Sequence, residues 1–376
     1  MNNQFNYKIS PLEMSISIMT MLIGVSVLVM PSRLAETMNS PDGWISIMIS
    51  GLAVAGLVTL YTRLQRRFPG QTLMGYFRQG ILGKWWALLM GMGFVLYFVG
   101  VAAYLVRTLV FVVQMYVLDQ TPSEAIASLF LLTTTYAVSK GLQGIIHLNL
   151  LFLPVTLFIG LGILSFNLPA MELANLLPVL GEGLSPVLKG VKEMIVPFLG
   201  VEILFFFMAH MTANHLRATP LNAGILVVTL IYVMVTVMSY AVFSLEAVKV
   251  IAFPTVELAK EVEVPGGFFE RLESLMITIW IMTIFNAAAV SQYLTVTIIN
   301  DQFLPHTKLA WLPSLITFVI FIIAFVPKSI TELFTFTEWV GWLGAALFFL
   351  GVGSGYVSVW VRNKTATWNM TEGSDK

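Results

Sequence analysis

Long apolar stretches, separated by short polar turns, run along almost the whole chain. Windows such as 44–61, 148–166 and 221–245 contain no Asp, Glu, Lys or Arg. A helix crosses a bilayer with about 20 consecutive apolar residues, so each window is long enough to span one. The pattern predicts ten spanning helices, with these approximate bounds: 11–36, 43–62, 86–118, 124–140, 145–167, 191–213, 221–245, 273–300, 309–327 and 336–361.

Composition agrees with this pattern. Of the 376 residues, 57% are hydrophobic and 11% are charged, whereas a soluble domain carries about 25% charged residues. We therefore expect a polytopic membrane protein embedded in the lipid bilayer, with 1–376 forming a single membrane domain. The net charge is zero, which gives no electrostatic reason to expect nucleic acid as a partner. The polar start of the chain has no short apolar segment before a cleavage site, so we expect no cleaved signal peptide.

The distribution of Lys and Arg predicts the orientation. The loop 63–84 alone carries five basic residues, whereas the loop 246–272 gathers glutamates. We therefore expect both termini on the cytoplasmic side, with 362–376 as a cytoplasmic tail. Two connections on the opposite side, 168–190 and 246–272, mix apolar and charged residues and leave two alternatives open. They either form short helices at the membrane interface or remain ordered loops.

Two predicted spans contain helix-breaking residues at mid-depth. The stretch GVSVLVMP, 24–31, lies in the first span, and Pro197 and Gly200 lie in the sixth. Five spans precede the sixth, so the breaks open two halves, 11–167 and 191–361, as in transporters built from inverted repeats. Kinking or close packing alone is the alternative explanation for Gly and Pro in each of these helices.

A broken helix in lipid leaves backbone groups that need partners. The N-H groups at a half-helix N-terminus suit a carboxylate, and freed carbonyl groups suit an ammonium group. The two breaks therefore predict a site for a small zwitterion such as an amino acid.

One acidic residue, Glu202, lies near mid-membrane, where a charged side chain is expensive and so indicates function. The alternative is that Glu202 only holds the broken helix in place. Arg107 in the third span either pairs with Glu202 or extends toward the outer surface.

Further candidates lie on regular helices. Tyr97 and Val101 share one face of the third span, and Ala287 and Ser291 share a face of the eighth, next to Asn286. Periodicity by itself favours core packing for these residues. The scattered histidines predict no metal site, and no catalytic motif or cofactor-binding motif is present, so we do not expect an enzyme.

Several segments resemble the B subunits of bacterial spore germinant receptors, which belong to the endospore-germination branch of the amino acid–polyamine–organocation superfamily. The similarity covers residues from about 8 to 362. It is carried by the following segments: NSPDGW (39–44), LLPVLGEGLSPV (176–187), FLGVEILFF (198–206), FPTVEL (253–258) and GGFFERLES (266–274) with the tryptophan at 280.

The resemblance implies an all-α, LeuT-like fold of ten helices in a five-plus-five inverted repeat, located in the inner membrane of the spore. It also implies an A subunit and a lipoprotein C subunit as partners, and a small nutrient germinant as ligand. The germinant pocket that it implies is lined by these residues: Gly24, Val25, Ser26, Tyr97, Val101, Phe198, Leu199, Gly200, Glu202, Asn286, Ala287 and Ser291. The small side chains at 287 and 291 suggest a pocket larger than alanine requires.

Two functions remain open. A sensor would bind a nutrient at the breaks and pass a conformational change to its partner subunits. An amino-acid/cation symporter would also need a coupling site, and the eighth span offers hydroxyl groups at Thr283 and Ser291 but no carboxylate. A purely structural scaffold does not account for the two breaks.

Overall fold

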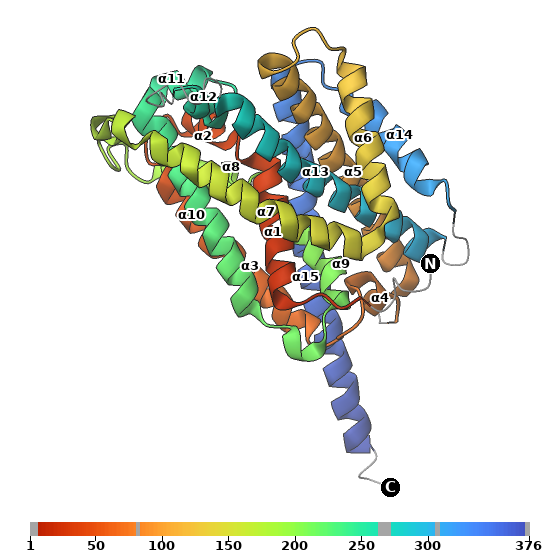
Figure 1. Cartoon of the computed structure of the whole chain (residues 1–376). Helices are drawn as coiled ribbons and strands as arrows, with labels where there is room; N and C mark the ends of the chain where they lie inside the picture. Colours follow the sequence, from red (N-terminus) through yellow and green to blue (C-terminus); the bar gives the residue numbers. More distant parts are fainter. Residues whose placement is uncertain (1–6, 80–82, 262–271, 305–308, 373–376) are drawn as a thin grey trace.

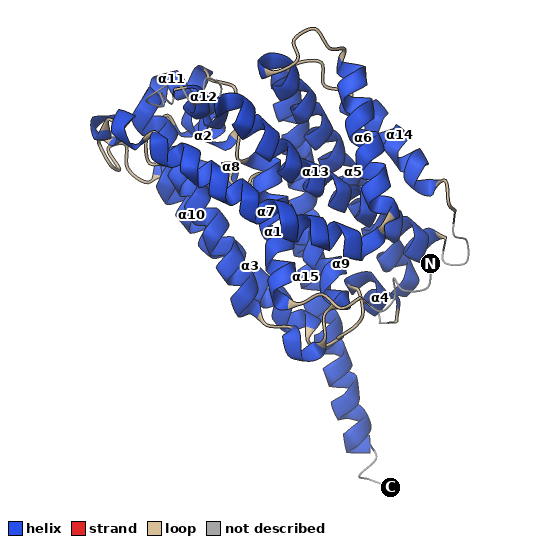
Figure 2. Ribbon diagram, in the orientation of Figure 1, coloured by secondary structure: helices blue, strands red, loops and turns tan. Residues whose placement is uncertain are grey.

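The protein is an all-helical bundle in the computed structural model, which describes residues 7–79, 83–261, 272–304 and 309–372. Figure 1 shows long helices crossing the molecule, and Figure 2 shows helices and loops without strands over these ranges. The helices are α1 (Pro11–Ser26), α2 (Met30–Met38), α3 (Gly43–Gln65), α4 (Leu73–Arg78), α5 (Gly83–Tyr116), α6 (Ser123–Ser139), α7 (Gly141–Phe166), α8 (Ser185–Glu193), α9 (Leu204–Phe207), α10 (Ala218–Phe243), α11 (Leu245–Val250), α12 (Pro254–Lys260), α13 (Leu272–Ile298), α14 (Leu312–Ala324) and α15 (Ile330–Glu372).

Within the described residues, six helices are long and apolar enough to cross a bilayer: α3, α5, α7 with its short extension to Ala170, α10, α13 with its extension to Phe303, and α15 up to Arg362. Pro11–Gly24, Val201–His210 and Leu312–Ala324 are shorter apolar helices. The protein is therefore a multi-pass membrane protein, while the count of ten spans stays a prediction.

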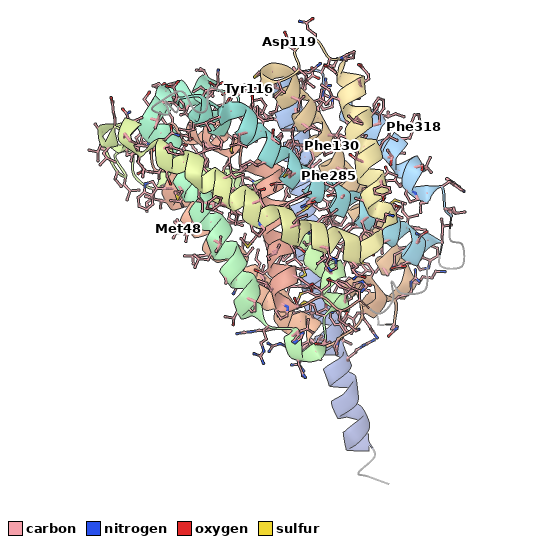
Figure 3. The ribbon with its side chains drawn as sticks, viewed as in Figure 1. Met48, Tyr116, Asp119, Phe130, Phe285 and Phe318 are labelled. Carbon is pink, nitrogen blue, oxygen red and sulfur yellow. The ribbon has the colours of Figure 1, made fainter. Side chains whose placement is uncertain are left out.

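Burial divides the helices into an inner and an outer set. α5 and α13 pack against each other at the centre, and α1 lies against α10, α13 and α7. The outer surfaces carry exposed apolar side chains, such as Phe158 on α7 and Trp339 on α15. Phe318 on α14 and Met48 on α3 lie on this outer side (Figure 3). Between the helices, the ring of Phe130 on α6 packs edge-on against that of Phe285 on α13, with 6.1 Å between the ring centroids. Apolar outer faces suit contact with lipid.

Several boundaries differ from the sequence prediction. α7 begins at Gly141 and not at the predicted residue 145. Only Lys140 separates α7 from α6, and Gly141, with φ of 74°, accommodates the sharp turn between the two helices. α15 begins at Ile330 and continues to Glu372, so most of the predicted tail is helical and projects from the bundle (Figure 1).

The connections 168–190 and 246–272, for which the sequence allowed either short helices or ordered loops, contain short helices where the structure describes them. Three-residue and four-residue 3-10 turns and the start of α8 lie within 168–190, and α11 and α12 occupy the described part of 246–272. Residues 262–271, including most of the GGFFERLES segment, lie outside the described residues. Tyr116, labelled in Figure 3, lies at the end of α5 and donates a 2.8 Å hydrogen bond to Glu257, which ties α12 to this end of α5.

Candidate functional site between two interrupted helices

The first predicted span is interrupted two residues later than its glycine suggests. α1 continues through Gly24 to Ser26, residues 27–29 form a turn, and α2 starts at Met30 with Pro31 in its first turn. Proline fits there because the first-turn N-H groups have no partner within the helix. The Thr255 hydroxyl donates to the carbonyl oxygen of Val27 at 2.7 Å. Part of the freed backbone is therefore satisfied by α12.

Gly24 is a packing residue in this conformation. A Cβ atom placed on it would lie 3.0 Å from the Cβ of Ala287 and 3.1 Å from the carbonyl oxygen of Thr283. α1 therefore contacts the backbone of α13 directly. At this contact there is no room for a ligand or an ion between Gly24 and Thr283.

The second predicted span is interrupted more extensively. α8 ends at Glu193, turns follow to Gly200, and a 3-10 turn at Val201–Ile203 precedes α9. Gly200 has φ of 113°, a backbone conformation that strongly favours glycine. A Cβ atom at Gly200 would also lie only 2.3 Å from Cγ of Met21 on α1. The two interrupted segments therefore touch at this point.

Glu202 stabilises the second break. Its Oε2 atom accepts hydrogen bonds from the backbone N-H of Gly200 and from the hydroxyl of Tyr97, both at 2.7 Å. The side chain is buried, with 4% of its surface exposed. These contacts match the structural alternative for Glu202, in which the carboxylate holds the broken helix against α5.

Arg107 does not pair with Glu202. Its Nε atom donates to the carbonyl oxygen of Pro327 at 2.9 Å, and its guanidinium lies 4.4 Å from the ring centre of Phe111 and 5.0 Å from that of Phe325. Arg107 therefore joins α5 to the end of α14. Of the two alternatives for Arg107, pairing with Glu202 is therefore wrong, because a nearer carbonyl group and two rings satisfy the guanidinium.

A small cavity of about 30 Å³ lies between the two breaks. Both interrupted segments line it, through Ser26 and Met30 from the first and Pro197 from the second, and Tyr104 of α5 and Thr337 of α15 complete the wall. The Ser26 hydroxyl is buried and finds no hydrogen-bond partner among the described residues. A buried hydroxyl without a protein partner is costly, so Ser26 is a candidate hydrogen-bonding group for a molecule bound in this cavity.

An ion-pair network covers this cavity on the α8 side. Arg33 of α2 pairs with Glu36, with Glu193 of α8 at 3.2 Å, and with Glu338 of α15 at 2.7 Å. Its guanidinium also lies 5.0 Å from the ring centre of Phe334. One cation therefore joins α2, α8 and α15 on this side of the cavity.

A larger groove of about 440 Å³ lies on the other side of the second break, between α3, α8 and α15. Phe198, Leu199 and Glu202 line this groove rather than the cavity between the breaks. Its lining is mostly apolar, and Ser50 contributes a buried hydroxyl without a partner among the described residues.

The structure places the remaining predicted site residues along α1, α5 and α13. Val101 is buried on α5 one turn beyond Tyr97. Asn286 donates to the carbonyl oxygen of Leu148 at 3.3 Å, and Ser291 donates to that of Ala287 at 2.9 Å, within α13. Val25 belongs to α1, but its side chain lies outside the described residues. Of the predicted residues whose side chains the structure describes, only Ser26 lines the cavity between the breaks.

Several cavity residues were absent from the sequence prediction. Tyr104 was identifiable, because it lies three residues after Val101 and seven after Tyr97, and these spacings keep it on the same helix face. The sequence spacing of Thr337 and Glu338 did not indicate that they belong to the cavity, because only the packing of α15 against α5 brings them to the first break. No group of three or more His, Cys, Asp or Glu side chains within the described ranges could hold a metal ion.

Solved structures of transporters have the same fold. The nucleobase-cation-symport-1 family transporter Mhp1, closed around bromovinylhydantoin, matches with a TM-score of 0.67 and 13% identity over 93% of this chain and 78% of its own. MhsT in complex with L-phenylalanine matches with a TM-score of 0.65 and 13% identity over 92% of this chain and 88% of its own. These are LeuT-fold proteins, and the likeness establishes the fold class alone.

Sequence comparison identifies closer relatives. Spore germination protein YndE of Bacillus subtilis (strain 168) is 32% identical over 91% of this chain and 93% of its own length. Spore germination protein A2 of the same organism is 27% identical over 88% and 89%, and GerLB of Bacillus cereus is 29% identical over 88% of each. The family model described as spore germination protein matches residues 8–333, and this chain therefore belongs to that family.

Proposed function

We propose that this chain is the nutrient-binding subunit of a spore germinant receptor. A small nutrient, such as an amino acid, binds between the two interrupted helices and shifts the protein toward a signalling conformation. The cavity walled by both breaks carries this proposal, because it contains the buried and unpartnered Ser26 hydroxyl. In this proposal the ten helices form two inverted repeats, and both termini lie on the spore-core side of the inner membrane.

The receptor partners in this proposal are an A subunit and a lipoprotein C subunit. They receive the conformational change, and they account for a transporter fold that signals instead of moving its ligand. Family membership supports this part of the proposal, because the relatives are spore germination proteins.

Nutrient transport is the second candidate, supported by the solved transporters of the same fold. The contact between α1 and α13 argues against a coupled cation there. The Thr283 hydroxyl donates to Thr156 at 3.1 Å, and the Thr283 carbonyl group faces Gly24 directly. These oxygens already have protein neighbours, so a cation would have to separate α1 from α13.

Purified full-length protein in liposomes distinguishes the two functions. A panel of labelled amino acids is tested for saturable binding, and then for uptake driven by a sodium or a proton gradient. Saturable binding without uptake is expected. Gradient-driven accumulation of a labelled amino acid would show that the protein is a symporter and not a sensor. Failure of every compound to bind would contradict both functions.

The Ser26→Ala variant tests the location of binding. It should weaken the saturable binding about threefold to tenfold, the range expected for one hydrogen bond. Ser32→Ala is the matched control, because the buried Ser32 hydroxyl donates to the Val29 carbonyl oxygen within the same segment, at 2.9 Å. Equal affinities of both variants and the unmodified chain would place the ligand elsewhere.

A further inference from the structure

Tyr232 on α10 contacts both interrupted segments through one hydroxyl group. Its oxygen lies 2.6 Å from the carbonyl oxygen of Leu22 on α1 and 3.0 Å from that of Pro197 in the second break. A phenol hydroxyl has a single proton to donate. The two carbonyl groups, one inside α1 and one in the second break, therefore share one donor.

The surroundings of Tyr232 leave this hydroxyl little freedom. Its side chain is fully buried, and the ring of Phe198 packs edge-on against it at a centroid distance of 5.8 Å. Leu22 lies four residues before Ser26, whereas Pro197 lies three residues before Gly200. A buried carbonyl group without a partner is costly. A single oxygen atom therefore bridges α1 and the second break, in addition to the contact of Gly200 with Met21.

We infer that Tyr232 is a positioning residue that holds α1 and the second break together in the conformation with the small cavity. The inference rests on the proposed function, because it concerns the same site. The cavity of about 30 Å³ has room for one or two water molecules, so an amino acid requires its walls to separate. Moving Pro197 away from α1 leaves the Tyr232 hydroxyl with one carbonyl partner instead of two.

Tyr232 therefore opposes opening, and its hydroxyl favours the conformation with the smaller cavity. A group that stabilises the closed conformation lowers the apparent affinity for any ligand that needs the open one. Removing the hydroxyl while keeping the ring should shift the population toward the open conformation by about threefold to tenfold, as for one hydrogen bond.

The chain has no cysteine, so a single engineered thiol can report on opening. In a Ser26→Cys background, the rate of labelling by a small methanethiosulfonate reagent is measured on the full chain without any nutrient. Adding Tyr232→Phe should raise this rate about threefold to tenfold. The measurement needs no ligand, so it can succeed even if the binding assay of the proposed function fails.

Tyr240→Phe is the matched control. Tyr240 is a fully buried tyrosine on the same helix, but its hydroxyl donates to one segment only, at the carbonyl oxygen of Pro31, 3.1 Å away. Both variants lose one buried hydroxyl, so their unfolding temperatures should fall by similar amounts. A labelling rate that is unchanged in Tyr232→Phe, or raised equally in Tyr240→Phe, would overturn the inference. If Tyr232→Phe does not fold, Tyr232→Leu, which removes the hydroxyl without adding volume to the fully buried site, must give the faster labelling instead.

Discussion

The Tyr97 hydroxyl donates a 2.7 Å hydrogen bond to the Glu202 carboxylate, whose same oxygen atom accepts the backbone N-H of Gly200. This relationship joins α5 to the second break at the centre of the molecule. It also gives Glu202 a structural task that the sequence left undecided, because the oxygen replaces a helical carbonyl group that the break has removed.

The first prediction separates the charge of Glu202 from its hydrogen bonding. Glu202→Gln keeps one carbonyl oxygen that can accept both hydrogen bonds, so it should cost less than about 1 kcal/mol of stability. Glu202→Leu leaves the Gly200 N-H and the Tyr97 hydroxyl without an acceptor and should cost about 2–6 kcal/mol. Thermal unfolding in detergent measures both variants. Equal and large losses would show that the negative charge itself is required.

The second prediction concerns the close contact of α1 with α13. Gly24→Ala places a methyl group 3.0 Å from Ala287 and 3.1 Å from the Thr283 carbonyl oxygen, so the helices must separate slightly. Overpacking of this kind typically costs about 1–3 kcal/mol. Gly56→Ala on α3 is the control, because nothing lies within 4 Å of its added methyl group. Thermal unfolding should show a loss for the first variant and none for the control.

Much of the fold followed from the sequence because apolar length is a strong signal. The positions of α3, α5, α10 and α13 agree with predicted spans to within a few residues. The interruptions were also predicted, from the stretch GVSVLVMP at 24–31 and from Pro197 with Gly200. Their exact limits were not, because Gly24 remains helical where α13 supports it.

The candidate site was less predictable than the fold. Local spacing could place Tyr97 and Val101 on one face, but it could not show that the Tyr97 hydroxyl is already bonded to Glu202. No pattern in the sequence singled out Arg33 as part of the site. Its three carboxylate partners come from 36, 193 and 338, and only tertiary packing brings the last two to α2.

The third prediction tests the backbone conformation at Gly200. Gly200→Ala combines an unfavourable φ of 113° with a clash against Met21, so it should cost more than about 2 kcal/mol and reduce the yield of folded protein. Gly70→Ala shares the positive φ, 77°, but has nothing within 4 Å of the added methyl group. Its loss should be limited to about 1–2 kcal/mol. Equal losses would mean that the contact with Met21 contributes nothing.

The fourth prediction concerns Arg107. Arg107→Lys keeps the charge but loses the Nε donor to Pro327 and the planar stacking on Phe111 and Phe325. The variant should be less stable by about 1–3 kcal/mol, while its nutrient affinity stays within twofold of the unmodified protein. Binding and thermal unfolding are measured on the same preparation. A large loss of affinity without loss of stability would show that Arg107 takes part in ligand binding.

The last prediction concerns the cover that Arg33 forms over the cavity. Arg33→Gln removes the cation shared by Glu36, Glu193 and Glu338 and leaves their carboxylates to repel one another. In the Ser26→Cys background, thiol labelling should then become several times faster. Raising the salt concentration should have the same effect on the Arg33-containing chain, because Glu36 and Glu338 are largely exposed and their ion pairs are screened.

Asp119→Cys, in the exposed connection between α5 and α6 (Figure 3), gives the labelling rate of an exposed thiol and should respond neither to the Arg33 replacement nor to salt. In the chain that retains Arg33, the thiol at position 26 should be labelled more slowly than the thiol at position 119. Equal rates would show that the ion-pair network does not close the cavity.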